Sequence, residues 1–152
     1  MIDTRGVVTE DEAALTQWFS HDLMIGGRTL EASSGERFDV INPATGETIT
    51  SVASASVQDA LDAVAAAETA LPGWAATPPR ERAEILRRAF DVLTARGEDL
   101  ARLIVIENGK SLADARGEMA YATEFFRWYS EEAVRILGSV QQAPAGKNRI
   151  LV

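Results

Sequence analysis

The chain has 152 residues, a formal net charge of −8 from 23 acidic and 15 basic residues, and no cysteine. Its length and 46% hydrophobic composition suit one modest globular domain. The acidic balance disfavours nucleic-acid binding, and the lack of cysteine excludes disulfides, thiolate metal sites and a cysteine nucleophile within these residues. No apolar run reaches the ~18 residues of a membrane span, and the acidic N-terminus lacks the apolar core of a signal peptide, so we expect a cytoplasmic protein.

The first third of the chain predicts a short helix followed by paired strands. Thr9 and Glu12 form a Thr-x-x-Glu capping box that begins the helix. Strands are expected over four short segments rich in apolar and β-branched residues: 23–25, 28–30, 38–41 and 48–52. Gly26-Gly27 marks the first hairpin turn, and the Asn-Pro-Ala-Thr-Gly sequence at residues 42–46 marks the loop of the second hairpin.

Helical signals dominate after residue 55. Helices are expected over residues 57–71, 79–96, 98–108 and 111–137. Ser56 and Asp59 form a capping box for the first of these helices. Pro72-Gly73 predicts the end of that helix, and Gly109 predicts the end of the third.

The predicted helix over residues 111–137 is apolar on two faces. Its main stripe alternates steps of three and four residues: Leu112, Ala115, Met119, Ala122, Phe126, Tyr129, Ala133 and Ile136. Tyr121, Phe125 and Trp128 form a second row, so we expect the domain core on one side and a subunit, a second domain or a substrate passage on the other. Residues 141–148 are expected to form a polar loop and residues 149–152 the beginning of a strand, which indicates an incomplete domain.

Few residues suggest chemistry of their own. His21 is the only histidine, and a surface position is a simpler interpretation than a catalytic triad. The Asn-Gly-Lys-Ser sequence at residues 108–111 resembles the tail of a phosphate-binding loop, but Ile104 stands where that motif requires glycine. The Gly-x-Gly-x-x-Gly dinucleotide fingerprint is absent from the sequence. Glu107 and Glu118 lie beside apolar helix positions, where a salt bridge or a helix cap is favoured over a buried-carboxylate role.

Several sequence blocks between residues 23 and 152 occur in a characteristic order and spacing. They cover residues 26–28, 40–47, 82 with 85–88, 100–104, 107–112, 115–122, 125, 128–129 and 131–136. Together they resemble the N-terminal part of the NAD(P)-dependent aldehyde dehydrogenase family. The Ala-Arg-Gly-Glu sequence at residues 115–118, followed by Trp128-Tyr129 and Glu131-Glu132, resembles the succinate-semialdehyde dehydrogenase branch in particular.

The resemblance implies an α/β fold of which this segment is mostly α-helical with short N-terminal β-strands. It implies that residues 1–22 form an N-terminal arm and helix. It further implies that residues 23–152 form an incomplete portion of the cofactor-binding domain, ending at the start of an oligomerisation strand. The implied activity is oxidation of an aldehyde, succinate semialdehyde in this branch, to its carboxylic acid with NAD or NADP. The implied assembly is a homo-oligomer, a dimer or a tetramer, without nucleic-acid or membrane partners.

The resemblance also assigns site residues, none of them catalytic. In the family a cysteine thiolate attacks the aldehyde and a glutamate activates water, but those residues and the cofactor-phosphate loop follow the region seen here. The chain alone is therefore expected to be inactive. The positions that match a structural monovalent cation site are Val40 and Ile41, through backbone carbonyls, and Glu107, through its carboxylate. Tyr121 and Phe125 match the wall of the substrate entrance.

Two other classes of function remain open on the sequence. A non-catalytic helical interaction module would bury the second aromatic face against a partner. An inactive truncated reading frame would keep the family's sequence pattern without its activity. Sequence downstream of residue 152 discriminates among the three, because a Pro-Trp-Asn-Phe segment and a cysteine-bearing segment there would complete an enzyme.

Overall fold

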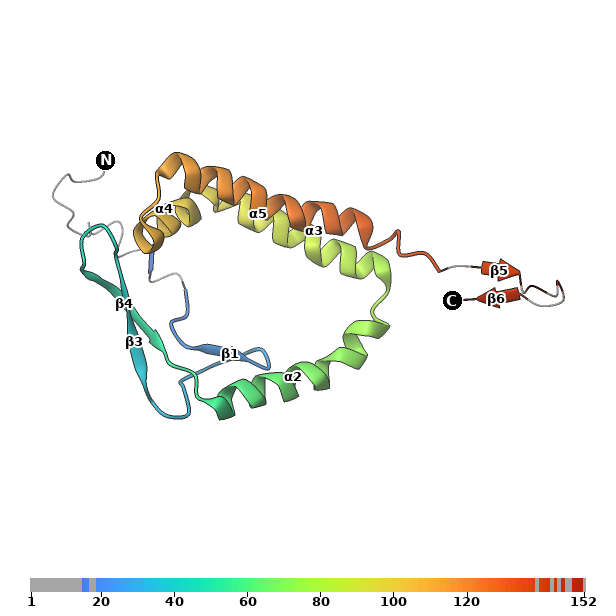
Figure 1. Ribbon diagram of the computed structural model, residues 1–152, viewed down its shortest axis with the longest axis horizontal. Coiled ribbons are helices and arrows are strands. Elements are labelled where there is room, and N and C mark those ends of the chain that lie inside the picture. The colour runs from blue at the N-terminus through green and yellow to red at the C-terminus, as the bar shows by residue number, and fades with distance from the viewer. Residues whose placement is uncertain are drawn as a thin grey trace.

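The structure is a computed structural model that describes residues 15–16, 19–138, 140–142, 144, 146 and 149–151. Three two-stranded antiparallel hairpins accompany four helices in this part of the chain (Figure 1). The hairpins are β1 (Leu23–Ile25) with β2 (Arg28–Leu30), β3 (Arg37–Ile41) with β4 (Thr48–Ala53), and β5 (Val140–Gln142) with β6 (Arg149–Leu151). The helices are α2 (Val57–Ala76), α3 (Pro79–Ala95), α4 (Gly97–Asn108) and α5 (Leu112–Glu132). The segment is mostly helical with short N-terminal strands, as predicted.

Local turn chemistry sets the first two hairpins. Gly26 and Gly27 both have positive φ, of 58° and 74°, which the tight β1–β2 turn requires. In the β3–β4 loop, Asn42 Oδ1 accepts a hydrogen bond from the Ala44 amide at 2.9 Å, and Gly46 has a φ of 76°. Both predicted hairpins are therefore confirmed.

The β3–β4 ladder contains an irregularity close to that loop. Val40 pairs with Thr50, whereas the next residue of β3, Ile41, pairs with Thr48. Ile49 is thus an extra residue on β4. Such a bulge interrupts the regular ladder and bends the strand locally.

Helix α2 begins as predicted but continues beyond the predicted end. The Ser56 hydroxyl accepts from the Asp59 amide, and the Asp59 carboxylate accepts from the Ser56 amide, so the capping box is complete. The expected stop at Pro72-Gly73 is wrong, because α2 passes through Pro72 and ends at Ala76. Thr77 supplies the stop: its amide donates to the Trp74 carbonyl and its hydroxyl to the Gly73 carbonyl. Pro78 then holds Thr77 in an extended conformation.

Helix α5 packs along both α3 and α4 and forms the centre of the helical region. Three alanines and one isoleucine are buried on these three helices: Ala83, Ala101, Ala115 and Ile106. Small residues let the helix backbones approach one another. Gly109 ends α4 in the left-handed region, with a φ of 77°, as its sequence position predicts.

Two expectations for the C-terminal part are corrected. Helix α5 ends at Glu132 rather than near Leu137, and of its expected apolar stripe only Ala115 is fully buried: Phe126, Tyr129 and Ile136 are 36%, 56% and 74% exposed, whereas the other buried positions on the helix are Thr123 and Ser130. Beyond Glu132 the apolar side chains lack the packing that stabilises a helix. The polar loop expected from residue 141 instead contains β5, whose pairing with β6 makes the strand. The terminal strand is therefore paired along one edge and is not an isolated edge.

Large apolar side chains are conspicuously exposed across the described helices. Among the described residues, no large side chain is fully buried. On α2, Val57, Leu61 and Val64 are 80%, 56% and 65% exposed. Soluble domains seldom leave large apolar patches in water, and such patches mark surfaces that contact other protein or a ligand.

Candidate functional site

The tip of the β3–β4 hairpin meets the C-terminal end of α4. A β-carbon added to Gly109 would lie 2.9 Å from Pro43 Cγ, closer than real side chains approach. Only glycine therefore fits at this junction, for its positive φ and for its lack of a side chain. The contact brings the segment that follows Ile41 against the helix end that carries Glu107.

The three positions expected around a cation thus lie on two segments that meet. Val40 and Ile41 flank the bulge of the hairpin, and Glu107 is an exposed residue of the last turn of α4. Within the described residues, no group of three or more histidine, aspartate or glutamate side chains is arranged to hold a metal. Any cation held here would depend on backbone carbonyl oxygens together with one carboxylate, a set of hard oxygen donors.

The expected substrate-entrance residues lie together on one face of α5. Tyr121 and Phe125 form an edge-to-face pair with ring centroids 4.9 Å apart and an interplanar angle of 86°. They are 68% and 45% exposed, and Trp128, one turn further on, is 57% exposed. The second aromatic row predicted from the sequence is thus present, and its rings are only partly covered by the described residues.

Ion pairs fasten α4 and its following loop to α5. Arg116 donates two hydrogen bonds to the Glu98 carboxylate, at 2.8 and 2.6 Å. These side-chain hydrogen bonds lower the pKa of Glu98 below its ordinary value and raise that of Arg116. Lys110 pairs with Glu118. The salt-bridge interpretation of Glu118 is therefore confirmed. The lysine of the Asn-Gly-Lys-Ser sequence, Lys110, forms an ion pair with α5.

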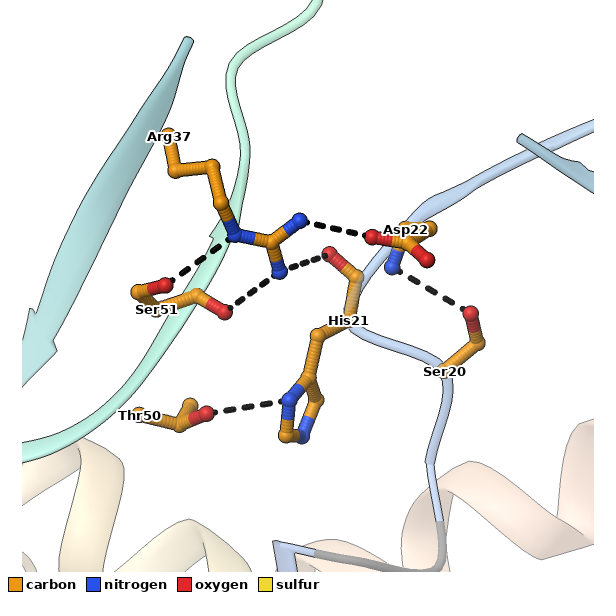
Figure 2. A network of polar contacts seen from close by, with 6 residues as sticks. All are labelled: Ser20, His21, Asp22, Arg37, Thr50 and Ser51. Atoms are coloured by element: carbon orange, nitrogen blue, oxygen red, sulfur yellow. Dashed lines mark hydrogen bonds and ion pairs between the residues drawn. The ribbon is translucent and has the colours of Figure 1, made fainter. Parts of the chain in front are cut away.

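His21 has a structural position that the sequence did not reveal. Its Nδ1 lies 3.1 Å from the Thr50 hydroxyl on β4, and its Nε2 lies 2.7 Å from the Thr16 carbonyl (Figure 2 shows the Thr50 contact). His21 is partly buried, and its ring lies in contact with both of these groups. The neighbouring Asp22 carboxylate binds Arg37 instead. These contacts give no Ser-His-Asp triad.

Arg37 is the second residue that sequence reasoning missed. Its guanidinium bonds with Asp22, with the His21 carbonyl and with both the hydroxyl and the carbonyl of Ser51 (Figure 2). The partners are 14 to 16 residues away in sequence. A single arginine in a strand is not part of a sequence pattern that predicts partners this far away in the chain.

Comparison with known proteins identifies the family. Residues 30–152 match the sequence model of the aldehyde dehydrogenase family. The chain belongs to this family. A succinate-semialdehyde dehydrogenase of Paenarthrobacter nicotinovorans is 57% identical over 104 residues, covering 68% of this chain and 23% of that enzyme. A glutarate-semialdehyde dehydrogenase of Pseudomonas aeruginosa is 43% identical over 134 residues, covering 88% of this chain and 28% of that enzyme.

The fold agrees with the sequence match. The crystal structure of an NADP-dependent enzyme from E. coli superposes on 90% of this chain with a TM-score of 0.86 and 39% sequence identity, over 28% of its own length. The chain therefore spans roughly a quarter of the length of the relatives it matches. None of the helices in the described part of the chain has the length and apolar character of a membrane span.

Proposed function

We propose that this chain is the N-terminal portion of an NAD(P)-dependent dehydrogenase that oxidises a dicarboxylic semialdehyde, succinate semialdehyde foremost, to its acid. The observation that carries the proposal is the 57% identity to an enzyme named for that substrate. The similarity to a glutarate-semialdehyde dehydrogenase supports the same substrate class, an aldehyde with a carboxylate at its far end.

The chain's own contribution to such an enzyme is structural. Bound NAD or NADP would accept the hydride. The residues present supply no cysteine to attack the aldehyde. In this proposal residues 1–22 form an N-terminal arm and the helix expected to begin at Thr9, most of which lies outside the described residues. Residues 23–152 form an incomplete portion of the cofactor-binding domain that ends at the start of an oligomerisation strand. The assembled enzyme would be a cytoplasmic homo-oligomer, a dimer or a tetramer.

Within that enzyme, Val40, Ile41 and Glu107 would hold a structural monovalent cation. Two observations support this assignment. The bulge in β4 interrupts the ladder opposite Val40 and Ile41. The close fit of Gly109 against Pro43 holds the hairpin tip to the end of α4.

Tyr121 and Phe125 would line the substrate entrance. Their edge-to-face contact gives two rings that brace one another, and their exposure leaves the ring faces available. Small-molecule sites are lined mostly by apolar and aromatic side chains, which suits these two rings to the wall of an entrance.

The same exposed aromatic row supports the alternative of a non-catalytic interaction module. The sequence encoded downstream of residue 152 distinguishes the two functions. The enzyme requires a Pro-Trp-Asn-Phe segment and a cysteine-bearing segment in that frame. A frame that lacks both would leave either an interaction module or an inactive truncated product.

A further inference from the structure

The β3–β4 hairpin receives little support from the other helices and strands. Within the part of the chain that the structure describes, it makes only sparse contacts with every other element. A two-stranded hairpin alone is marginally stable in water and normally needs a third strand or a packed face. Something else must therefore hold its strands and fix the register of the bulge.

The segment formed by His21 and Asp22 binds the open end of the hairpin. The His21 carbonyl accepts a hydrogen bond from the Ala53 amide at 2.8 Å, at the open end of the hairpin. The Arg37 guanidinium donates to the same carbonyl at 3.3 Å and to the Asp22 carboxylate at 2.7 Å. Figure 2 shows Arg37 between this segment and β4.

Arg37 also joins the two strands of the hairpin to one another. Its Nε donates to the Ser51 hydroxyl at 3.1 Å and its Nη2 to the Ser51 carbonyl at 2.9 Å. One planar guanidinium thus fixes β3, β4 and the segment before β1 together. Arginine suits this position because its donors form a rigid fork, whereas a lysine ammonium is a flexible point charge.

The His21 ring reaches the hairpin at the bulge itself. Its partner Thr50 is the residue directly across the ladder from Val40, and the bulged Ile49 follows on the side toward the loop. The Thr50 hydroxyl can donate to the ring nitrogen or accept from it. The contact therefore fixes the last regular pair before the ladder is interrupted.

We infer that His21 and Arg37 are positioning residues for the cation site. They hold the register that presents the Val40 and Ile41 carbonyls, so the N-terminal segment and the cation stabilise one another. This inference rests on the cation site proposed above. The contacts that His21 and Arg37 make with Asp22, Thr50, Ser51 and Ala53 are called the polar clasp. Because binding linkage is reciprocal, the free energy by which the cation stabilises the clasp equals the free energy by which the clasp strengthens cation binding.

The test measures hydrogen exchange in the full chain, on the peptide that covers β4, during titration with sodium or potassium chloride. Choline chloride keeps the ionic strength constant, so that general electrostatic screening does not change during the titration. The wild-type chain should show slower exchange as the alkali cation is added. Arg37→Gln should raise the apparent dissociation constant for the cation by roughly fivefold or more, the lower bound of typical coupling.

Two further variants keep the test decisive. Thr50→Val removes only the hydroxyl that meets His21 and should weaken cation binding even if Arg37→Gln fails to fold. Arg135→Gln is the matched control. Arg135 lies just beyond α5 and pairs with Glu132, the last residue of that helix. The Arg135→Gln variant should bind the cation as the wild type does.

The possible outcomes distinguish failure of this inference from failure of the proposed cation site and of the proposed enzymatic activity. No cation-dependent protection in the wild type overturns both the cation site and its coupling to the clasp. Protection with equal cation affinity in wild type, Arg37→Gln and Thr50→Val overturns the coupling alone. Neither result depends on aldehyde oxidation, so the proposed activity is tested separately.

Discussion

Replacing Gly109 by alanine should destabilise the chain through two separable effects. Gly109 has a φ of 77°, and a residue with a side chain in the left-handed region costs ~1–2 kcal/mol. The new methyl group would also lie 2.9 Å from Pro43 Cγ. Forcing such overpacking typically costs ~1–3 kcal/mol. Together these losses are a sizeable part of the ~5–15 kcal/mol that keeps a domain folded.

Gly46 offers a matched control for the backbone effect. Its φ is 76° and an added β-carbon would meet no atom within 4 Å. Gly46→Ala should therefore lose only the ~1–2 kcal/mol of the left-handed conformation. Urea unfolding followed by far-UV circular dichroism gives the free energy of unfolding of each variant.

A double variant assigns the remaining difference to the contact itself. Pro43→Ala removes Cγ, so it should restore part of the stability lost in Gly109→Ala. The two substitutions should be non-additive, as expected for residues in contact. Equal losses in Gly109→Ala and Gly46→Ala, with additive effects of Pro43→Ala, would refute the junction of the hairpin tip with α4 and remove support for the cation site.

The remaining predictions concern association, acid stability and substrate access. Analytical ultracentrifugation should show that the 152-residue chain self-associates. Burying each exposed aromatic ring of α5 would contribute roughly 1.5–3 kcal/mol of stabilisation, which favours association. A monodisperse monomer with one sharp thermal transition would contradict this prediction. Hydrogen bonds from Ser56, above all, and Ser33 hold the pKa of Asp59 below its ordinary value. The stability that the Asp59 carboxylate contributes is therefore complete above the unfolded pKa of about 3.9 and is lost as pH falls through the lower folded pKa. The urea midpoint of unfolding should be higher for the wild type than for Asp59→Asn at pH 7, and the two midpoints should become equal in strong acid. A difference between the midpoints that does not change with pH would contradict this prediction. In the complete enzyme, Phe125→Ala should raise KM for the semialdehyde more than it lowers kcat, whereas unchanged kinetics would place the entrance elsewhere.

Local sequence signals predicted most of the elements because their causes are local. The Ser56–Asp59 capping box, the positive φ at Gly46 and Gly109 and the turn at Gly26-Gly27 each depend on a few neighbouring residues. The sequence did not predict the end of α2 correctly, because the helix ends at Thr77 and Pro78 and not at Pro72. Thr77 donates hydrogen bonds to carbonyls of the last helical turn. Proline removes one donor from a helix, and the rest of the ladder can continue past it.

The polar clasp at Arg37 could not be predicted because its partners are distant in sequence. Arg37 and Asp22 are fifteen residues apart, and His21 and Thr50 are 29 apart. Neither pair follows a helical or strand periodicity that sequence reasoning can use. β5 was missed for a related reason: its strand arises from pairing with β6 and not from its own polar residues.

The cation and entrance positions came from family resemblance and not from pattern. Glu107 is an exposed glutamate at a helix end, and nothing in its spacing relates it to Val40 or Ile41. The structure adds the contact of Gly109 with Pro43, which joins their segments. Tyr121 and Phe125 were predicted as a second aromatic row, and the structure shows the pair in edge-to-face contact.

The most direct test of the account replaces the corresponding N-terminal segment of the Paenarthrobacter nicotinovorans succinate-semialdehyde dehydrogenase with this chain. NADH or NADPH formation from succinate semialdehyde is then measured for the purified chimera, with the isolated chain as the control. We predict no activity from the isolated chain and a kcat/KM for the chimera within about tenfold of the parent, a difference of ~1.4 kcal/mol in transition-state stabilisation. A chimera that purifies as a folded, monodisperse oligomer yet forms no reduced cofactor would contradict the proposed function.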